Sequence, residues 1–259
     1  TKNCKNFLIP KLKVCNENKQ ANFAIDFGTT NTHIEYVCDD HVVVPFENDE
    51  SSSIFQSLVD RNSDMDPLVR TREDIFEKEL LPFNIKTNTE ICFPIRTALA
   101  VNNQIDFSGN LEIFREANNY LLYEENPEPD YLNIFTQLKW SNYSESKDEI
   151  KVRSYIEYLL ILVYYKSLLL GGDPLQTKII WFYPVSMEGS ESSDGELGIF
   201  IKIWKEVYLK IFNIKDCENL IQIPESVAPY LFYKASTTGL SLSIDIGGGS
   251  SDIAVFDEN

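Results

Sequence analysis

Two short stretches of the sequence combine an aspartate with a turn of glycines and hydroxyl residues, and both could hold a phosphate group. Residues 24–37 read AIDFGTTNTHIEYV, and residues 243–256 read SIDIGGGSSDIAVF. In each stretch an apolar segment typical of a β-strand reaches an aspartate, and a second apolar segment follows a tight turn. Backbone N–H groups in such a turn can converge on an anion, and neighbouring hydroxyl groups add further donors.

The two stretches also align with each other. Asp26 falls on Asp245, and Gly28 falls on Gly247. A glycine-rich hairpin taken alone is more often only a turn, but a repeat at this long spacing indicates two related half-molecules that begin with the same hairpin. Two such hairpins facing each other would bind a polyphosphate between them. The residues expected to bind phosphate are Gly28, Thr29, Thr30, Asn31, Gly247, Gly248, Gly249 and Ser250.

The aspartates of the two hairpins are the expected metal ligands. Mg²⁺ in nucleotide sites is held by one or two carboxylates together with the phosphates, so we expect Asp26 and Asp245 to hold Mg²⁺. His33 and His41 are the only histidines, which nearly excludes a histidine-based metal site or catalytic triad.

The overall composition is that of an acidic globular protein. The chain has 259 residues, of which 43% are hydrophobic, enough for a full core and more than one subdomain. A net charge of −17 argues against a nucleic-acid or anionic-membrane surface. It leaves an anionic nucleotide possible, because N–H groups and Mg²⁺ can reverse the sign of the field within one site. Five cysteines without a CxxC pair predict reduced thiols and a cytoplasmic location.

The order of the expected elements indicates an α/β protein. The most apolar stretch, residues 155–170, is shorter than the roughly 20 residues that a membrane-spanning helix needs, so we expect a buried helix there. Helices and strands alternate in the second half of the chain, which predicts an α/β layer with right-handed crossovers. The segments expected to be strands are 22–37 (a hairpin), 41–46, 178–185 and 219–223. The segments expected to be helices are one entered at Asp66-Pro67, then 112–125, 149–170, 196–212 and 225–236.

In this order the chain resembles the actin / heat-shock chaperone / sugar-kinase ATPase superfamily, and most closely its DnaK-type chaperone branch. IDFGTTNTHIEYV resembles the first phosphate motif of the family, and IDIGGGSSDIAVF resembles the second, of the form D-x-G-G-G-[ST]-x-D. Between them, NLIQIPESVAPYLFYKA at 219–235 resembles the connecting segment. EIFREANNYLLYEENPEPDYLNIFTQLKW at 112–140 resembles the stretch that leads to a catalytic lysine.

The resemblance implies a ribonuclease-H-like lobe that binds Mg²⁺ and ATP, with Lys139, Glu225, Asp245 and Asp252 as catalytic residues. The two aspartates would orient the attacking water or the metal, and Glu225 would help to polarise that water. Phosphoryl transfer needs positioning and charge neutralisation more than covalent chemistry, which suits carboxylates, Mg²⁺ and a lysine. Two of these residues also have a simpler interpretation: Glu225 as a first-turn helix acid, and Lys139 as an exposed lysine that ends a helix.

The resemblance also implies domain boundaries. Residues 1–21 would be an extension, 22–240 the first lobe with a subdomain inserted at about 47–140, and 241–259 the first hairpin of a second lobe that has been cut away. Since the family holds its nucleotide between two lobes, we expect this chain alone to bind ATP weakly and to hydrolyse it negligibly. We expect the segment 242–256 to be poorly anchored, to pair with another molecule, or to fold back on its own lobe.

The leading functional hypothesis is an ATP-binding and ATP-hydrolysing lobe of a chaperone-like protein, whose partners are the nucleotide, the second lobe and a protein client. One alternative is a bacterial actin-like filament protein, which would associate with itself. Another is a pseudo-ATPase that kept the fold as a binding scaffold. An exopolyphosphatase-like hydrolase fits the GGGS turn, but such enzymes usually have a glutamate where Asp252 stands.

Overall fold

The computed structural model describes the chain in several ranges. These are residues 19–39, 42–46, 94–102, 105, 107–109, 111, 113, 117–119, 132–143, 145–189, 195–233, 239–249 and 251–258. The helix expected at Asp66-Pro67, most of the expected inserted subdomain, and Ser250 lie outside the described residues.

A mixed sheet forms the centre of the molecule, with strands in the order β3-β2-β1-β8-β9 and with β4 also paired to β2. β1 and β2 are antiparallel and form the first expected hairpin, whereas β8 runs parallel to both β1 and β9. The bounds are β1 Ala21–Phe27, β2 Asn31–Cys38, β3 Val44–Pro45, β4 Ile95–Arg96, β8 Lys178–Tyr183 and β9 Leu220–Pro224. This arrangement confirms the α/β class and places the expected strand at 178–185 beside the first strand. β3 is shorter than the expected 41–46, and its Pro45 suits an edge position because proline cannot donate to a neighbouring strand.

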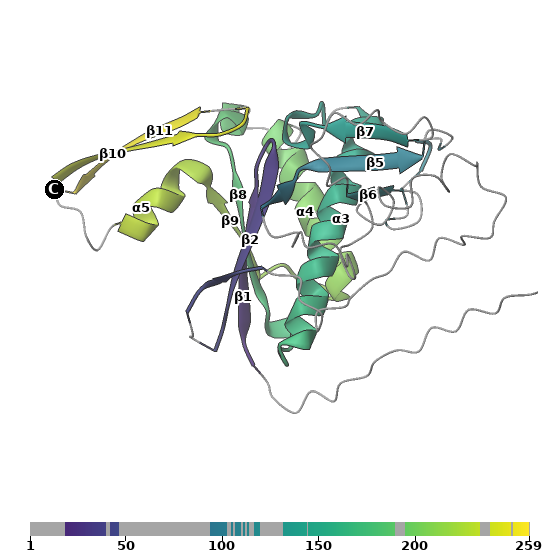
Figure 1. Ribbon diagram of the computed structural model, residues 1–259, viewed down its shortest axis with the longest axis horizontal. Helices are drawn as coiled ribbons and strands as arrows, with labels where there is room; N and C mark the ends of the chain where they lie inside the picture. Colours follow the sequence, from purple (N-terminus) through teal and green to yellow (C-terminus); the bar gives the residue numbers. More distant parts are fainter. Residues whose placement is uncertain are drawn as a thin grey trace, which may run out of the picture.

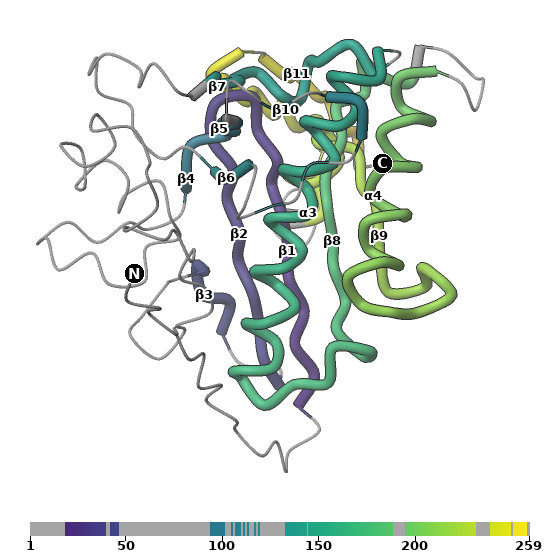
Figure 2. Tube along the Cα trace, turned by 90° about the vertical axis from the view of Figure 1, so that its right-hand side faces the viewer, coloured from purple at the N-terminus to yellow at the C-terminus, as the bar shows by residue number. Residues whose placement is uncertain are grey.

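Two long helices cover one face of this sheet, α3 (Ser146–Leu169) and α4 (Glu196–Phe212) (Figure 1). Figure 2 shows α3 lying along the sheet in front of β1 and β2. The rings of Trp181 on β8 and Trp204 on α4 stack with their centroids 4.8 Å apart, and both are almost fully buried. α3 is the buried helix expected from residues 155–170, although it begins three residues before the expected start at 149. Among the described helices, none has the length and apolar character needed to cross a membrane.

The alternation of β1 places Asp26 on the opposite face. Ala21, Phe23, Ile25 and Phe27 are buried, and the Phe27 ring stacks on residues of both long helices. Successive side chains of a strand point to opposite faces, so Asp26 points away from this core. That face is the one toward the short helix α5 (Ala228–Tyr233) in Figure 1.

A second, smaller sheet has the order β6-β5-β7. Its strands are β5 Ala98–Asn102, β6 Ala117–Asn119 and β7 Leu132–Thr136. The expectation of a helix over 112–125 is therefore wrong at residues 117–119, where Asn119 is paired with Leu99 of β5. Pairing with a neighbouring strand has overridden a weak local helical preference.

The closing hairpin consists of β10 (Gly239–Ile246) and β11 (Ser251–Glu258), which pair only with each other among the described strands. It contacts the rest of the chain at its turn, where Gly248 and Gly249 lie against Thr30 and Thr29, and at Phe256, whose ring stacks on Tyr230 of α5 with centroids 4.8 Å apart. The helix expected at 225–236 begins as a 3-10 turn, η5 (Glu225–Val227), before α5. The other 3-10 turns are η2 Leu138–Trp140, η3 Pro174–Gln176 and η4 Val185–Gly189.

Candidate functional site

The turns of the two hairpins border one cleft of about 460 Å³ at the carboxyl ends of β1, β8 and β9. Ligands of open α/β sheets bind outside the carboxyl ends of parallel strands, so the cleft lies where a ligand is expected. Of the residues expected in the site, all line the cleft except Gly249, which lies against the Thr29 side chain, and Ser250, which is not described. The lining residues are Asp26, Gly28, Thr29, Thr30, Asn31, Lys139, Phe182, Glu225, Ala228, Pro229, Asp245, Ile246, Gly247, Gly248 and Asp252.

The two turns touch each other through glycine. A Cβ atom added at Gly248 would overlap the side chain of Thr30, and one added at Gly249 would overlap that of Thr29. Glycine, which has no Cβ, is the residue that allows this close approach. Gly28 is constrained within its own turn, where a Cβ would overlap the backbone carbonyl of Asn31. The turns thus lie against each other, as the sequence repeat predicts.

The closing hairpin carries two aspartates that face each other across its strands. Asp245 and Asp252 are directly paired in the register of β10 and β11. Like charges directly opposite each other destabilise a strand pair, so this arrangement lowers the stability of the hairpin unless a cation lies nearby. It is the kind of local conflict that proteins keep at functional sites.

Asp26 faces this pair from the first hairpin. Desolvation raises the pKa of the Asp26 carboxyl, the positive charge of Lys139 lowers it, and the negative charge of Asp245 raises it again, with a net upward shift. The repulsion between Asp26 and Asp245 shows that the two expected metal ligands share one electrostatic environment. Within the described part of the chain, no three Asp, Glu, His or Cys side chains form a cage for a metal by themselves. Two hard carboxylate ligands nevertheless fit Mg²⁺, which takes its other ligands from phosphates and water.

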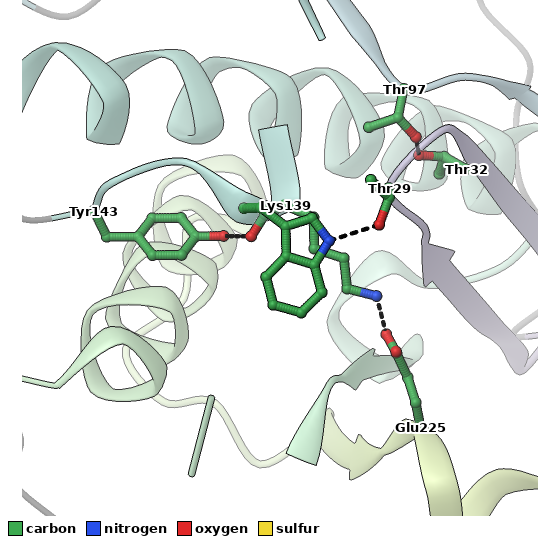
Figure 3. A network of polar contacts seen from close by, with 7 residues as sticks. Thr29, Thr32, Thr97, Lys139, Tyr143 and Glu225 are labelled. Carbon is green, nitrogen blue, oxygen red and sulfur yellow. Dashed lines mark hydrogen bonds and ion pairs between the residues drawn. The ribbon is translucent and has the colours of Figure 1, made fainter. Parts of the chain in front are cut away.

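Lys139 and Glu225 form a buried ion pair at the floor of the cleft, and Figure 3 shows their side chains meeting there. The Lys139 side chain is 3% exposed and that of Glu225 is 15% exposed. The pKa of Glu225 is raised, chiefly by desolvation, against the opposing effect of Lys139. The hydroxyl group of Tyr143 donates to the backbone carbonyl of Lys139 and so fixes η2. Lys139 is therefore not the exposed helix-end lysine of the simpler interpretation.

Side-chain hydrogen bonds connect the first turn and the start of β2 to neighbouring elements. The indole Nε1 of Trp140 donates to Oγ1 of Thr29 at 2.8 Å. The hydroxyl groups of Thr32 and Thr97 are hydrogen-bonded at 2.8 Å, as Figure 3 shows, and Tyr155 donates to Thr32 at 3.0 Å. These buried bonds tie the start of β2 to α3 and to the residue before β5.

Sequence reasoning missed Trp140, which donates to Thr29. It also missed four apolar residues that line the cleft, Phe182, Ala228, Pro229 and Ile246. Trp140 directly follows Lys139, the expected catalytic lysine. The available signal was this position together with the indole N–H, which can only donate a hydrogen bond. Phe182 is the last but one residue of β8, and it could have been found from the rule that ligands of open α/β sheets bind outside the carboxyl ends of parallel strands.

Comparison with models of known protein families and with curated proteins finds no match for this chain.

Proposed function

We propose that the cleft binds Mg²⁺ and ATP, and that the chain acts as the ATPase lobe of a DnaK-type, chaperone-like protein located in the cytoplasm. The observation that carries the proposal is the meeting of the first turn, with Gly28, Thr29 and Thr30, and the second turn, with Gly247 and Gly248, at one cleft with the buried Lys139–Glu225 pair. The turns come from opposite ends of the chain, and each brings an aspartate to the same space.

Different residues of the cleft would bind phosphate, stabilise negative charge and accept a proton. The turn residues Gly28, Thr29 and Gly248 offer N–H groups and a hydroxyl group to phosphate oxygens. Lys139 places one positive charge at the floor, where negative charge would develop during transfer of a phosphoryl group. Glu225, whose pKa is raised, lies where it could accept a proton from an attacking water molecule. Bound Mg²⁺ would neutralise phosphate charge and orient the transferred group.

The fold supports the same proposal at a coarser level. The resemblance implies a ribonuclease-H-like lobe, and such a lobe requires the strand at 178–185 to lie in the sheet of the first hairpin. β8 lies beside β1 in parallel orientation, in agreement with this requirement.

Titration of the protein with ATP in the presence and absence of Mg²⁺ tests the proposal, with binding followed by calorimetry and by the amide NMR signals of the two turns. We expect saturable binding that shifts the signals of Gly28 and Gly248 and weakens without Mg²⁺. Asp26→Asn and Asp245→Asn should each weaken binding at least tenfold, the loss of about one strong charge contact. Asp216→Asn, on the exposed loop after α4, is the matched control and should bind as the wild type does.

Turnover is measured separately as phosphate release. If neither ATP nor Mg²⁺ shifts the turn signals at millimolar concentration, the cleft is not a nucleotide site and the proposal is wrong. If nucleotide binds equally well to both aspartate variants, the nucleotide lies elsewhere on the protein.

A further inference from the structure

Trp140 is a residue that neither the sequence repeat nor the expected catalytic set includes. We propose that Trp140 is a positioning residue: its indole N–H occupies an acceptor site of the Thr29 hydroxyl group and thereby directs the hydroxyl proton to an anionic ligand in the cleft. This inference rests on the proposed function, because it assigns a role in the same phosphate site.

The chemistry of the two groups fixes the direction of the hydrogen bond. An indole Nε1–H can only donate, whereas a threonine hydroxyl has one proton and two acceptor lone pairs. In the 2.8 Å bond between them, Trp140 is therefore the donor and Thr29 the acceptor. The proton of the hydroxyl group is not used by this bond and remains to be donated.

The environment of Thr29 limits where that proton can go. Thr29 is 9% exposed and lines the cleft, and its methyl group lies against Gly249 of the opposing turn. With the methyl group held by Gly249 and the oxygen held by Trp140, rotation about the Cα–Cβ bond is restricted. Within the part of the chain that the structure describes, Trp140 is the one recorded hydrogen-bond partner of this hydroxyl group.

This polarity selects for a class of ligand. Oxygens of an ionised phosphate accept hydrogen bonds and do not donate them, so they match a hydroxyl group that has a proton to give. An ammonium or guanidinium group could use only the second lone pair of the hydroxyl group and would leave its proton without an acceptor. Thr29 would then donate with an orientation set before the ligand arrives, and preorganised donors raise affinity because less ordering accompanies binding.

The indole itself is well anchored. Its neighbours in η2 are Leu138, which is 1% exposed, and Lys139, which is held by the ion pair with Glu225. Trp140 is 38% exposed, whereas Trp181 and Trp204, the only other tryptophans, are buried in the core. Ligand-induced changes in tryptophan fluorescence and in the indole NMR signals should therefore come from Trp140.

The test measures binding of Mg²⁺–ATP and of inorganic tripolyphosphate with Mg²⁺ to the wild-type protein and to Trp140→Phe, which keeps an aromatic ring but removes the N–H donor. We expect Trp140→Phe to weaken both ligands about threefold to tenfold, the usual effect of one hydrogen bond. The same substitution is then made in Thr29→Ser, which keeps a hydroxyl group, and in Thr29→Val, which lacks one. We expect the effect of Trp140→Phe to persist with serine and to vanish with valine, because two residues that act through one bond are not additive.

Three outcomes are decisive. If the wild type binds both ligands and Trp140→Phe binds them within twofold, the positioning role is wrong while the proposed function stands. An equal loss in the threonine and valine backgrounds would show that the ring acts by packing, which also overturns the inference. If the wild type binds neither ligand and the indole NMR signal of Trp140 does not move, both the proposed function and this inference fall.

Discussion

The cleft contains more acidic than basic side chains, and Lys139, which forms the ion pair with Glu225 at its floor, supplies positive charge that acts on the acidic ones. Lys139 lowers the pKa values of both Asp26 and Glu225, and desolvation outweighs it at each. The negative charges of Asp26 and Asp252 raise the pKa of Glu225 further. The positive charge of buried Lys139 thus offsets part of the repulsion among the carboxylates of the cleft. Removing Lys139 should change the pKa values of these carboxylates and the free energy of unfolding of the protein.

The raised pKa of Glu225 predicts a pH dependence of stability. Because the folded protein holds this proton more tightly than the unfolded chain, the contribution of Glu225 to the free energy of unfolding falls as the pH rises from the ordinary value of 4.5 through the raised pKa. Titration of the Glu225 carboxyl by carbon NMR should give a midpoint above 4.5, and Lys139→Met should move it higher still. A midpoint below 4.5 in the wild type would show that the ion pair outweighs desolvation.

Loss of Lys139 also predicts a direct loss of stability. Lys139→Met leaves Glu225 buried without its partner, and breaking a buried pair in this way costs about 3 kcal/mol in the free energy of unfolding. Urea denaturation measures the change. Lys147→Met, the same substitution at an exposed lysine of α3, is the control and should change stability by less than about 0.5 kcal/mol. Adding Glu225→Gln to Lys139→Met should restore part of the loss, and no restoration would contradict the pairing as its cause.

At the scale of elements, the parts that could be predicted from the sequence are those whose signals are local. The two hairpins were found from glycine and aspartate, and α3 and β8 were found from long apolar stretches. The three-residue strand β6 was missed because its pairing with β5 depends on residues about twenty positions away in the chain. The contact between the turns was expected from the repeat, but its tightness against Thr29 and Thr30 depends on how the hairpins dock, which no local pattern encodes.

The docking of the two turns predicts the effect of a single methyl group. Gly248→Ala places a Cβ where the Thr30 side chain lies, so the turns must separate and the N–H groups of the second turn move away from the ligand. We expect at least a tenfold loss of Mg²⁺–ATP affinity with a small change in melting temperature, since the buried core is untouched. Gly109→Ala, where an added Cβ meets nothing within 4 Å, is the control. In a Thr30→Gly background, which removes the side chain that the Cβ would overlap, Gly248→Ala should cause no further loss of binding; a further loss would show that the overlap is not the cause.

At the scale of the whole molecule, the closing hairpin has two different faces. Asp245 and Asp252 lie on the face toward the cleft together with Phe256, which stacks on Tyr230. The other face carries Ser251, Asp257 and six apolar side chains that are each between 58% and 79% exposed: Leu240, Leu242, Ile244, Ile246, Ile253 and Val255. Of these, Ile246 also borders the cleft at the end of β10. The hairpin contacts the rest of the chain at its turn and at Phe256 but pairs with none of the other described strands, while poor anchoring and association with another molecule stay predictions.

The exposed face predicts self-association through the hairpin. Contiguous apolar patches of this kind mark interaction surfaces, and burying one Ile side chain contributes roughly 1.5–3 kcal/mol. The net charge of −17 opposes contact between two copies, so we expect association to be stronger in high salt, where that repulsion is screened. Sedimentation velocity over a range of protein concentrations measures this association.

The double variant Ile244→Thr and Ile253→Thr, at two cross-strand partners, should weaken association at least tenfold while keeping strand-forming side chains. Leu175→Thr removes an exposed leucine outside the hairpin and should leave association unchanged. A wild-type protein that stays monomeric at every concentration and salt tested would show that this face of the hairpin does not bind a second copy of the chain.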